Sequence, residues 1–258
     1  MSKGGFDKYK LDESILAIFS SSHSGEEMHT QPLLNILKEH NIGVDELYCN
    51  PHWPLNEEFS RKIASQGEIP SKIHNNCSGK HTAMLLMCQY FGFEYDQYWS
   101  KDHPLQKLLI DYLSDLFEYK LTNIAIDGCG APIPYIDSRN VIHAANKLLI
   151  EDSDIAEAWN RVTSSMKENP YLVAGTGRFD SVLMDRSSQK LTAKVGAEGV
   201  IFLHSEIDPT TKKHYRIAAK IVFFILEPRH AEVPPQGLSL TRSRPPRQAF
   251  VLPDEDIA

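Results

Sequence analysis

The stretch His74–Phe91 constrains the fold of this chain most, because it carries clear signals for both ends of a helix. Polar turn and cap residues open it, and apolar side chains then recur at helical spacing from Ala83 to Phe91. Gly92 supplies a C-terminal stop. The pattern predicts an amphipathic helix that begins near Gly79 and turns one face toward a core.

Cys77 and Lys80 lie where this helix begins. Unpaired backbone N–H groups and the helix dipole favour a thiolate at that end and disfavour a cation. A lysine in the first turn therefore needs a partner such as an anion, a metal or a substrate carboxylate. The pair fits a functional site, and it also fits a buried cysteine beside a solvated lysine.

The first forty residues predict a strand, a turn and a helix. Ser14–Phe19 is a short apolar run that suits a buried strand. A hydroxyl-rich turn follows, and Ser24 with Glu27 has the spacing of a capping box, which predicts a helix that stops by Gly43. A turn between a strand and a helix often presents a nucleophile, although a serine run can also serve only as a helix cap.

Further helices and strands are expected downstream. A stripe of leucines over Pro104–Phe117 indicates a core helix. A sharp turn with two glycines follows a short strand and is expected to expose the side chain of Cys129. The remaining expected elements are strand Asn123–Ile126, helices Val141–Ile150 and Ile155–Lys167, and strands Ser181–Met184, Leu191–Val195 and Gly199–Leu203.

The apolar stretch Tyr215–Leu226 carries Lys220 in its middle. A buried lysine is costly unless it is paired with an anion or its pKa is lowered. This position therefore indicates Lys220 as a candidate general base.

Charge and cysteine content exclude several classes of function. The formal net charge of −7 over 258 residues, with no basic patch, argues against a nucleic-acid-binding surface. No run approaches the roughly 18 apolar residues of a membrane span, and the first residues have no apolar core for a signal peptide. The four cysteines are too few for a dense disulfide framework, so we expect reduced thiols in the cytoplasm.

Residues 228–258 differ in composition from the rest of the chain. They hold six of the fifteen prolines, together with four arginines, and have no apolar periodicity. The sequence therefore predicts a folded domain over residues 1–227 and a disordered Pro/Arg-rich tail over residues 228–258.

Six segments, in order along the chain, together resemble one family, the L-asparaginase II proteins of the Rhizobium etli type. Any one motif is weakly specific, but six in order at suitable spacing are strongly specific. The segments are Ser22–Glu26, Cys49–Leu55, Asn76–His81, Asp127–Pro132, Ala174–Asp180 and Lys194–Val200.

The resemblance implies an amidohydrolase that converts L-asparagine to L-aspartate and ammonia. It also implies an α+β fold, a mixed α/β sandwich similar to that of serine β-lactamases and penicillin-binding proteins. Members of the intact family are homodimers, so the resemblance implies a homodimer as well.

Carried over to this chain, the family pattern implies roles for eight residues. Ser22 would be the nucleophile and Lys220 its base, as in Ser–Lys hydrolases. A zinc ion would be held by Cys77, Lys80 and Cys129, because two thiolates, a neutral amine and a water complete a four-coordinate site. The residues expected to orient the substrate are His81, Asp127 and Arg178.

The sequence departs from the family pattern at both ends. The family carries a further N-terminal segment with an Arg-Ser-x-x-Lys-Pro motif, which is absent here, and the residues that follow Lys220 also differ. We therefore expect an incomplete version of the fold, with uncovered sheet edges, low stability and at best weak activity.

Two other functions fit the same residues. One is a non-catalytic, zinc-binding remnant of the family that keeps Cys77, Lys80 and Cys129. The other is a thiol amidase in which Cys129 or Cys77 works with His81. Zinc binding without turnover would favour the first, and complete loss of activity in Cys129→Ser would favour the second.

Overall fold

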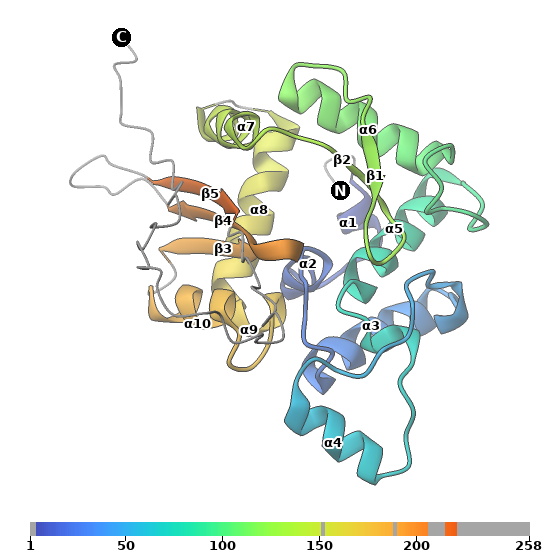
Figure 1. Ribbon diagram of the computed structural model, residues 1–258. Coiled ribbons are helices and arrows are strands. Elements are labelled where there is room, and N and C mark those ends of the chain that lie inside the picture. The colour runs from blue at the N-terminus through green and yellow to red at the C-terminus, as the bar shows by residue number, and fades with distance from the viewer. Residues whose placement is uncertain (1–3, 151–152, 188–189, 206–214, 221–258) are drawn as a thin grey trace, which may run out of the picture.

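The computed structural model describes residues 4–150, 153–187, 190–205 and 215–220 (Figure 1). Helices make up most of this part of the chain, and two small sheets complete it. The helices are α1 (Gly5–Lys8), α2 (Ser14–Phe19), α3 (Glu27–Glu39), α4 (Glu57–Ser65), α5 (Ser78–Phe91), α6 (Pro104–Phe117), α7 (Ser138–Ile150), α8 (Asp154–Glu168), α9 (Pro170–Val173) and α10 (Phe179–Arg186), with short 3-10 turns at Val44–Glu46, Lys72–His74 and Ala197–Gly199.

Both sheets are antiparallel. Strands β1 (Ile124–Ile126) and β2 (Pro132–Pro134) form a two-stranded ribbon around the glycine-rich turn. Strands β3 (Leu191–Val195), β4 (Val200–Ser205) and β5 (Arg216–Lys220) form a second sheet in that order. Helices α8 and α10 pack against β3, and α7 packs against β5, as Figure 1 shows. The mixture of helices and small antiparallel sheets confirms the α+β class; the similarity to serine β-lactamases stays a prediction.

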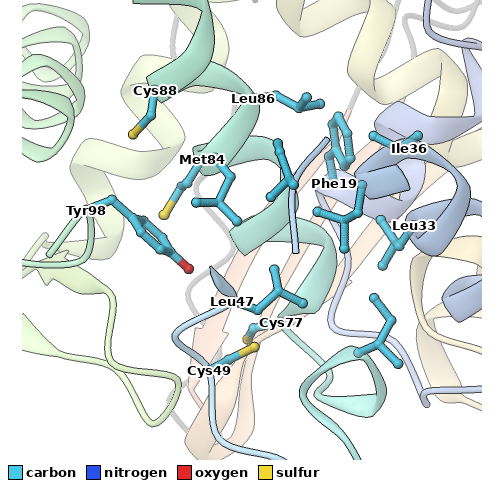
Figure 2. Close-up of a cluster of buried hydrophobic side chains, with 14 of the residues drawn as sticks. Phe19, Leu33, Ile36, Leu47, Cys49, Cys77, Met84, Leu86, Cys88 and Tyr98 are labelled. Carbon is cyan, nitrogen blue, oxygen red and sulfur yellow. The ribbon is translucent and has the colours of Figure 1, made fainter. Parts of the chain in front are cut away.

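Helix α2 is shared by two hydrophobic cores. Ile15, Ile18 and Phe19 belong to a large cluster, the helical core, which also contains buried side chains of α3, α5 and α6 (Figure 2). Ala17 belongs to a smaller cluster, the sheet core, which lies against β3. The remaining members of the sheet core are Met166, Val173, Met184 and Ala193.

Two predicted strands are helices in the structure. Ser14–Phe19 is α2, whose first turn begins where Asp12 accepts hydrogen bonds from the N–H and hydroxyl of Ser14. Ser181–Met184 is part of α10. A short run that is apolar on every side has no period, so it suits a buried helix as well as a buried strand.

The start of α3 also differs from the prediction. The N-cap is Glu26, which forms a reciprocal capping pair with His29, and the helix ends at Glu39. Ser24 does not cap the helix, because its hydroxyl donates to the carbonyl oxygen of Ala174 at 2.7 Å.

The predictions for α5, α6, α8 and the strand β3 are confirmed, with ends that differ by at most one or two residues. Gly92 ends α5 in the left-handed conformation, with φ at 71°. Residues 228–258, predicted to be a disordered tail, lie outside the described residues. Among the described residues, no helix is long and apolar enough to cross a membrane.

Candidate active site at the start of α5

A tight loop fixes Cys77 at the start of α5. The side chain of Asn75 accepts the backbone N–H of Cys77 at 2.9 Å, and its amide donates to the carbonyl of Asn50 at 2.7 Å. Gly79 follows in the first turn of the helix, where a Cβ atom would lie 2.3 Å from the carbonyl oxygen of Ile18. A side chain at this position would therefore push α5 away from α2.

The turn between β1 and β2 carries Asp127 and Cys129. The backbone N–H of Asp127 donates to Ala131 at 2.9 Å, and the N–H of Gly130 donates back to Asp127 at 2.8 Å. Gly130 has φ at 89°, and a Cβ atom there would lie 2.4 Å from the ring of Tyr48. The turn buries Cys129 to 5% exposure, so the prediction of an exposed thiol was wrong.

The two loops bring four polar side chains together, which we call the thiol cluster: Cys77, Lys80, Asp127 and Cys129. The ligand atoms of Cys77, Asp127 and Cys129 all lie within 4.8 Å of one another. The Lys80 ammonium lies 3.0 Å from Oδ2 of Asp127, and the Cys129 sulfur lies 3.3 Å from the same oxygen. The start of α5 and the β1–β2 turn, which are distant in sequence, therefore contribute side chains to the same cluster.

The pKa values of the two thiols are shifted in opposite directions. A hydrogen bond from Cys77 lowers the pKa of Cys129 to about 4, against the opposing effect of burial and with help from His81 and the charge of Lys80. The same hydrogen bond, together with burial, raises the pKa of Cys77. The hydrogen bond between the sulfurs therefore favours negative charge on Cys129 over Cys77, whereas the dipole argument favoured Cys77.

Lys80 and Asp127 form the charged half of the cluster. Burial opposes the charge of Lys80, but the two sulfurs and Asp127 outweigh it, so that the pKa of Lys80 is raised. Burial likewise acts to raise the pKa of Asp127, and the hydrogen bond and charge of Lys80 more than offset it, so that this pKa is lowered. The anionic partner that a lysine in the first turn requires is thus present within the chain.

These residues fit a zinc ion. Two thiols, an amine and a carboxylate are donors that Zn²⁺ accepts, and thiolates select it over harder cations. The sulfurs and the Asp127 oxygen are close enough to share one ion after small adjustments. For Lys80 to act as a ligand, its amine would have to be deprotonated and would have to turn from Asp127 toward the sulfurs.

The loop that carries Ser22 is attached to this site. The N–H of His23 donates to the carbonyl of Asn76 at 3.1 Å, and the His23 ring lies 3.0 Å from the hydroxyl of Ser78. The hydrogen bond between His23 and Asn76 joins the two loops. Ser22 precedes His23 and Cys77 follows Asn76, so each lies next to one partner of this bond. Ser22 itself is half-buried, and its N–H donates to Val173 at 3.2 Å.

Two further residues with predicted roles, Lys220 and Arg178, lie in β5 and at the start of α10. Lys220 ends β5, where it pairs with Val200, and its side chain lies outside the described ones. Arg178 caps α10 and is half-buried. Its charge, together with that of Lys80, lies close enough to Lys194 to help lower the pKa of that lysine, which burial lowers most.

Two residues that the sequence reasoning did not assign belong to this neighbourhood. Lys194 lies in β3, with its ammonium on the carbonyl of Val195 and within electrostatic range of Cys77 and Asp180. The argument that indicated Lys220, a lysine within an apolar strand, would also have indicated Lys194. Tyr98 contacts His81 from outside every motif, and nothing in the sequence indicates it.

Residues 1–222 match the family model described as L-asparaginase II. A comparison with curated proteins found no match to the chain.

Proposed function

The chain belongs to the L-asparaginase II family, and from this membership we propose that it hydrolyses the side-chain amide of L-asparagine to give L-aspartate and ammonia. The observation that carries the proposal is the convergence of Cys77, Lys80, Asp127 and Cys129 beside the loop of Ser22. The family supports an amidohydrolase, and the thiol cluster beside the loop of Ser22 supports a site at this place.

We assign Ser22 as the nucleophile and Lys220 as its base. The Ser22 hydroxyl attacks the amide carbon while the neutral amine of Lys220 takes its proton. The resulting ammonium returns that proton to the departing nitrogen, so that ammonia leaves and an ester to Ser22 remains. Water then hydrolyses the ester to aspartate, with the same amine acting again as base.

The charged ends of asparagine need fixed partners. Asp127 offers an anion for the substrate α-amino group, and Arg178 offers a cation for the α-carboxylate. His81, which interacts with Cys129, completes the set of residues that we assign to substrate orientation. Cys77, Lys80 and Cys129 would hold the zinc ion, which when bound supplies a fixed positive charge near the substrate.

Ammonia release by the purified chain, with L-asparagine and L-glutamine as alternative substrates, tests this proposal. Ser22→Ala is expected to lower kcat by about a thousandfold or more, because it removes the nucleophile. Ser20→Ala, a change at the other end of the same loop, is the matched control and should stay within about twofold of the parent. Equal activity of Ser22→Ala and the parent would refute the assignment.

A thiol amidase is the second candidate, and the lowered pKa of Cys129 beside His81 favours it. The two functions respond oppositely to two substitutions. In a Ser–Lys asparaginase, Cys129→Ser weakens zinc binding and leaves some turnover, whereas Ser22→Ala abolishes it. In a thiol amidase Cys129→Ser abolishes turnover and Ser22→Ala leaves it. Zinc binding without any turnover in the parent would identify a non-catalytic remnant of the family.

The homodimer, the cytoplasmic location and the division into residues 1–227 and 228–258 stay predictions. Sedimentation of the purified chain measures the first directly.

A further inference from the structure

The hydroxyl of Tyr98 lies in the interior, between a backbone amide and the ring of His81. Tyr98 and His81 are both fully buried, at 0% exposure. The backbone N–H of Tyr48 donates to the Tyr98 oxygen at 2.9 Å, and the same oxygen lies 2.6 Å from Nδ1 of His81. Figure 2 shows the hydroxyl directed into the helical core, on the side where Cys77 and Cys49 lie.

These contacts determine where the protons lie. A buried hydroxyl hydrogen needs an acceptor, since leaving it unpaired costs about 1–3 kcal/mol. The Tyr48 amide can only donate, so the acceptor at hydrogen-bond distance is Nδ1 of His81. A neutral imidazole that accepts at Nδ1 carries its own hydrogen on Nε2.

The second ring nitrogen of His81 is not engaged by Tyr98. Nε2 of His81 is buried and has no hydrogen-bond partner of ordinary geometry among the residues that the structure describes. It lies close enough to Cys129 to stabilise negative charge on that sulfur. An N–H at Nε2 can donate toward the Cys129 sulfur, whereas a lone pair there could not.

We propose that Tyr98 is a positioning residue of this site: its hydroxyl donates to Nδ1 of His81 and so holds the Nε2–H toward the sulfur of Cys129. Tyr98 touches neither substrate nor metal, and it acts through His81. The consequence for metal binding rests on the proposed function, because it requires Cys129 to be a zinc ligand. Groups that orient metal ligands in this way typically contribute a factor of about 10 to 100 in metal affinity.

The tautomer of His81 is measurable without metal, substrate or turnover. In the metal-free chain labelled with ¹⁵N-histidine, long-range ¹H–¹⁵N spectra distinguish Nδ1–H from Nε2–H rings. The chain has 11 histidines, and the His81 signals are those that vanish in His81→Gln. The parent is expected to show the Nε2–H form. A parent with the Nδ1–H form at His81 would overturn the proposal, whatever Tyr98→Phe does.

Tyr98→Phe removes the hydroxyl and keeps the ring that packs edge-on against His81. We expect His81 to become a mixture of tautomers in this variant. Tyr9→Phe is the matched control, because it removes a hydroxyl that donates to the carbonyl of Leu86 at 3.2 Å, beside the same core. The control should leave the His81 spectrum unchanged.

Zinc affinity, measured by competition with a chelator, gives the second readout. Tyr98→Phe is expected to weaken zinc binding by about 10- to 100-fold and Tyr9→Phe by less than about twofold. In the His81→Gln background, where the glutamine amide replaces Nε2–H, Tyr98→Phe should add less than about twofold. A full effect of Tyr98→Phe in that background would show a merely structural role and overturn the proposal.

The two experiments separate this proposal from the proposed function. A parent chain that binds no zinc or hydrolyses no asparagine refutes the function. The tautomer result is unaffected by that outcome, and it tests without zinc or turnover whether Tyr98 orients His81.

Discussion

Three buried histidines lie next to the loop that carries Ser22. The rings of His23 and His29 stack at 4.8 Å, and His74 accepts the N–H of Ser71 at 3.1 Å. Burial lowers the pKa of all three, and the neighbouring histidines lower that of His23 further. Each ring is therefore neutral in the folded protein at pH values where an unfolded chain would begin to protonate it.

This difference predicts acid sensitivity. Between the folded-state pKa values and 6.5, the unfolded chain binds more protons than the folded one, so the free energy of unfolding falls as the pH falls. The stabilisation is complete above about pH 6.5 and is lost at up to about 1.4 kcal/mol per pH unit for each histidine. Urea unfolding at several pH values between 5 and 8 measures this slope.

His23→Gln tests whether the buried histidines cause this pH dependence of the free energy of unfolding. It should reduce the pH dependence, whereas a change at the exposed His143 should not. A free energy of unfolding that stays flat from pH 8 to pH 5 would contradict the prediction.

Helices α2 and α5 approach each other closely at Gly79. Gly79→Ala would place a methyl group 2.3 Å from the carbonyl oxygen of Ile18. We expect it to lower the free energy of unfolding by about 1–3 kcal/mol, although alanine favours helices more than glycine does. Gly43→Ala is the control, because its Cβ would meet Glu46 at an ordinary 3.8 Å. Equal stability of the two variants would refute this reading of the contact.

A single hydroxyl joins α2 to α8. Ser165 donates to the carbonyl of Glu13 at 2.6 Å and accepts the N–H of Ala17 at 3.0 Å. Ser165→Ala is expected to cost about 1–2 kcal/mol, because two buried hydrogen bonds are lost. The neighbouring Ser164→Ala should change the free energy of unfolding by less than about 0.5 kcal/mol. Thermal or urea unfolding of the two variants compares them.

Sequence patterns predicted the long elements better than the short ones. Over Pro104–Phe117 and Ser78–Phe91, apolar spacing and end signals agree, and both helices occur. In the six residues of α2 every position is apolar except the first, so the period carries no information. Helix α2 lies between two hydrophobic cores and contacts residues that are distant in sequence, such as Ser165. These contacts favour the helix, and they cannot be seen in the sequence of the segment alone.

The same limit applies to the site. Cys77, Lys80 and Cys129 could be named from motifs, and Asp127 came with them as a substrate-binding candidate. The pairing of Asp127 with Lys80 at 3.0 Å could not be predicted, since it depends on how the β1–β2 turn meets α5. Tyr98 could not be found at all, because a tyrosine outside every motif becomes informative only when its hydroxyl partner is known.

At the scale of the whole molecule, burial is uneven. Ile18 and Leu85 in α2 and α5 are fully buried, whereas Ile126 and Ile133 in the β1–β2 ribbon are 63% and 42% exposed. Regions with few buried contacts open at a lower free energy than the core. The amides of α2 and α5 should thus exchange hydrogen most slowly, and those of the ribbon faster.

Hydrogen–deuterium exchange followed by mass spectrometry of peptides checks this order. Peptides from Ser78–Phe91 and from Ile124–Pro134 should differ by at least about tenfold in exchange rate at equal pH. Uniform protection across both peptides would contradict the uneven distribution of stability.

The position of α2 between the helical core and the sheet core also matters for protein engineering. The loop of Ser22 leaves directly from its last turn, so repacking either core to raise thermal tolerance moves the same six-residue support. Libraries aimed at heat resistance would therefore do best to vary α4 or α7 and leave Ser14–Phe19 untouched. Gains in melting temperature obtained elsewhere can then be combined without displacing the serine.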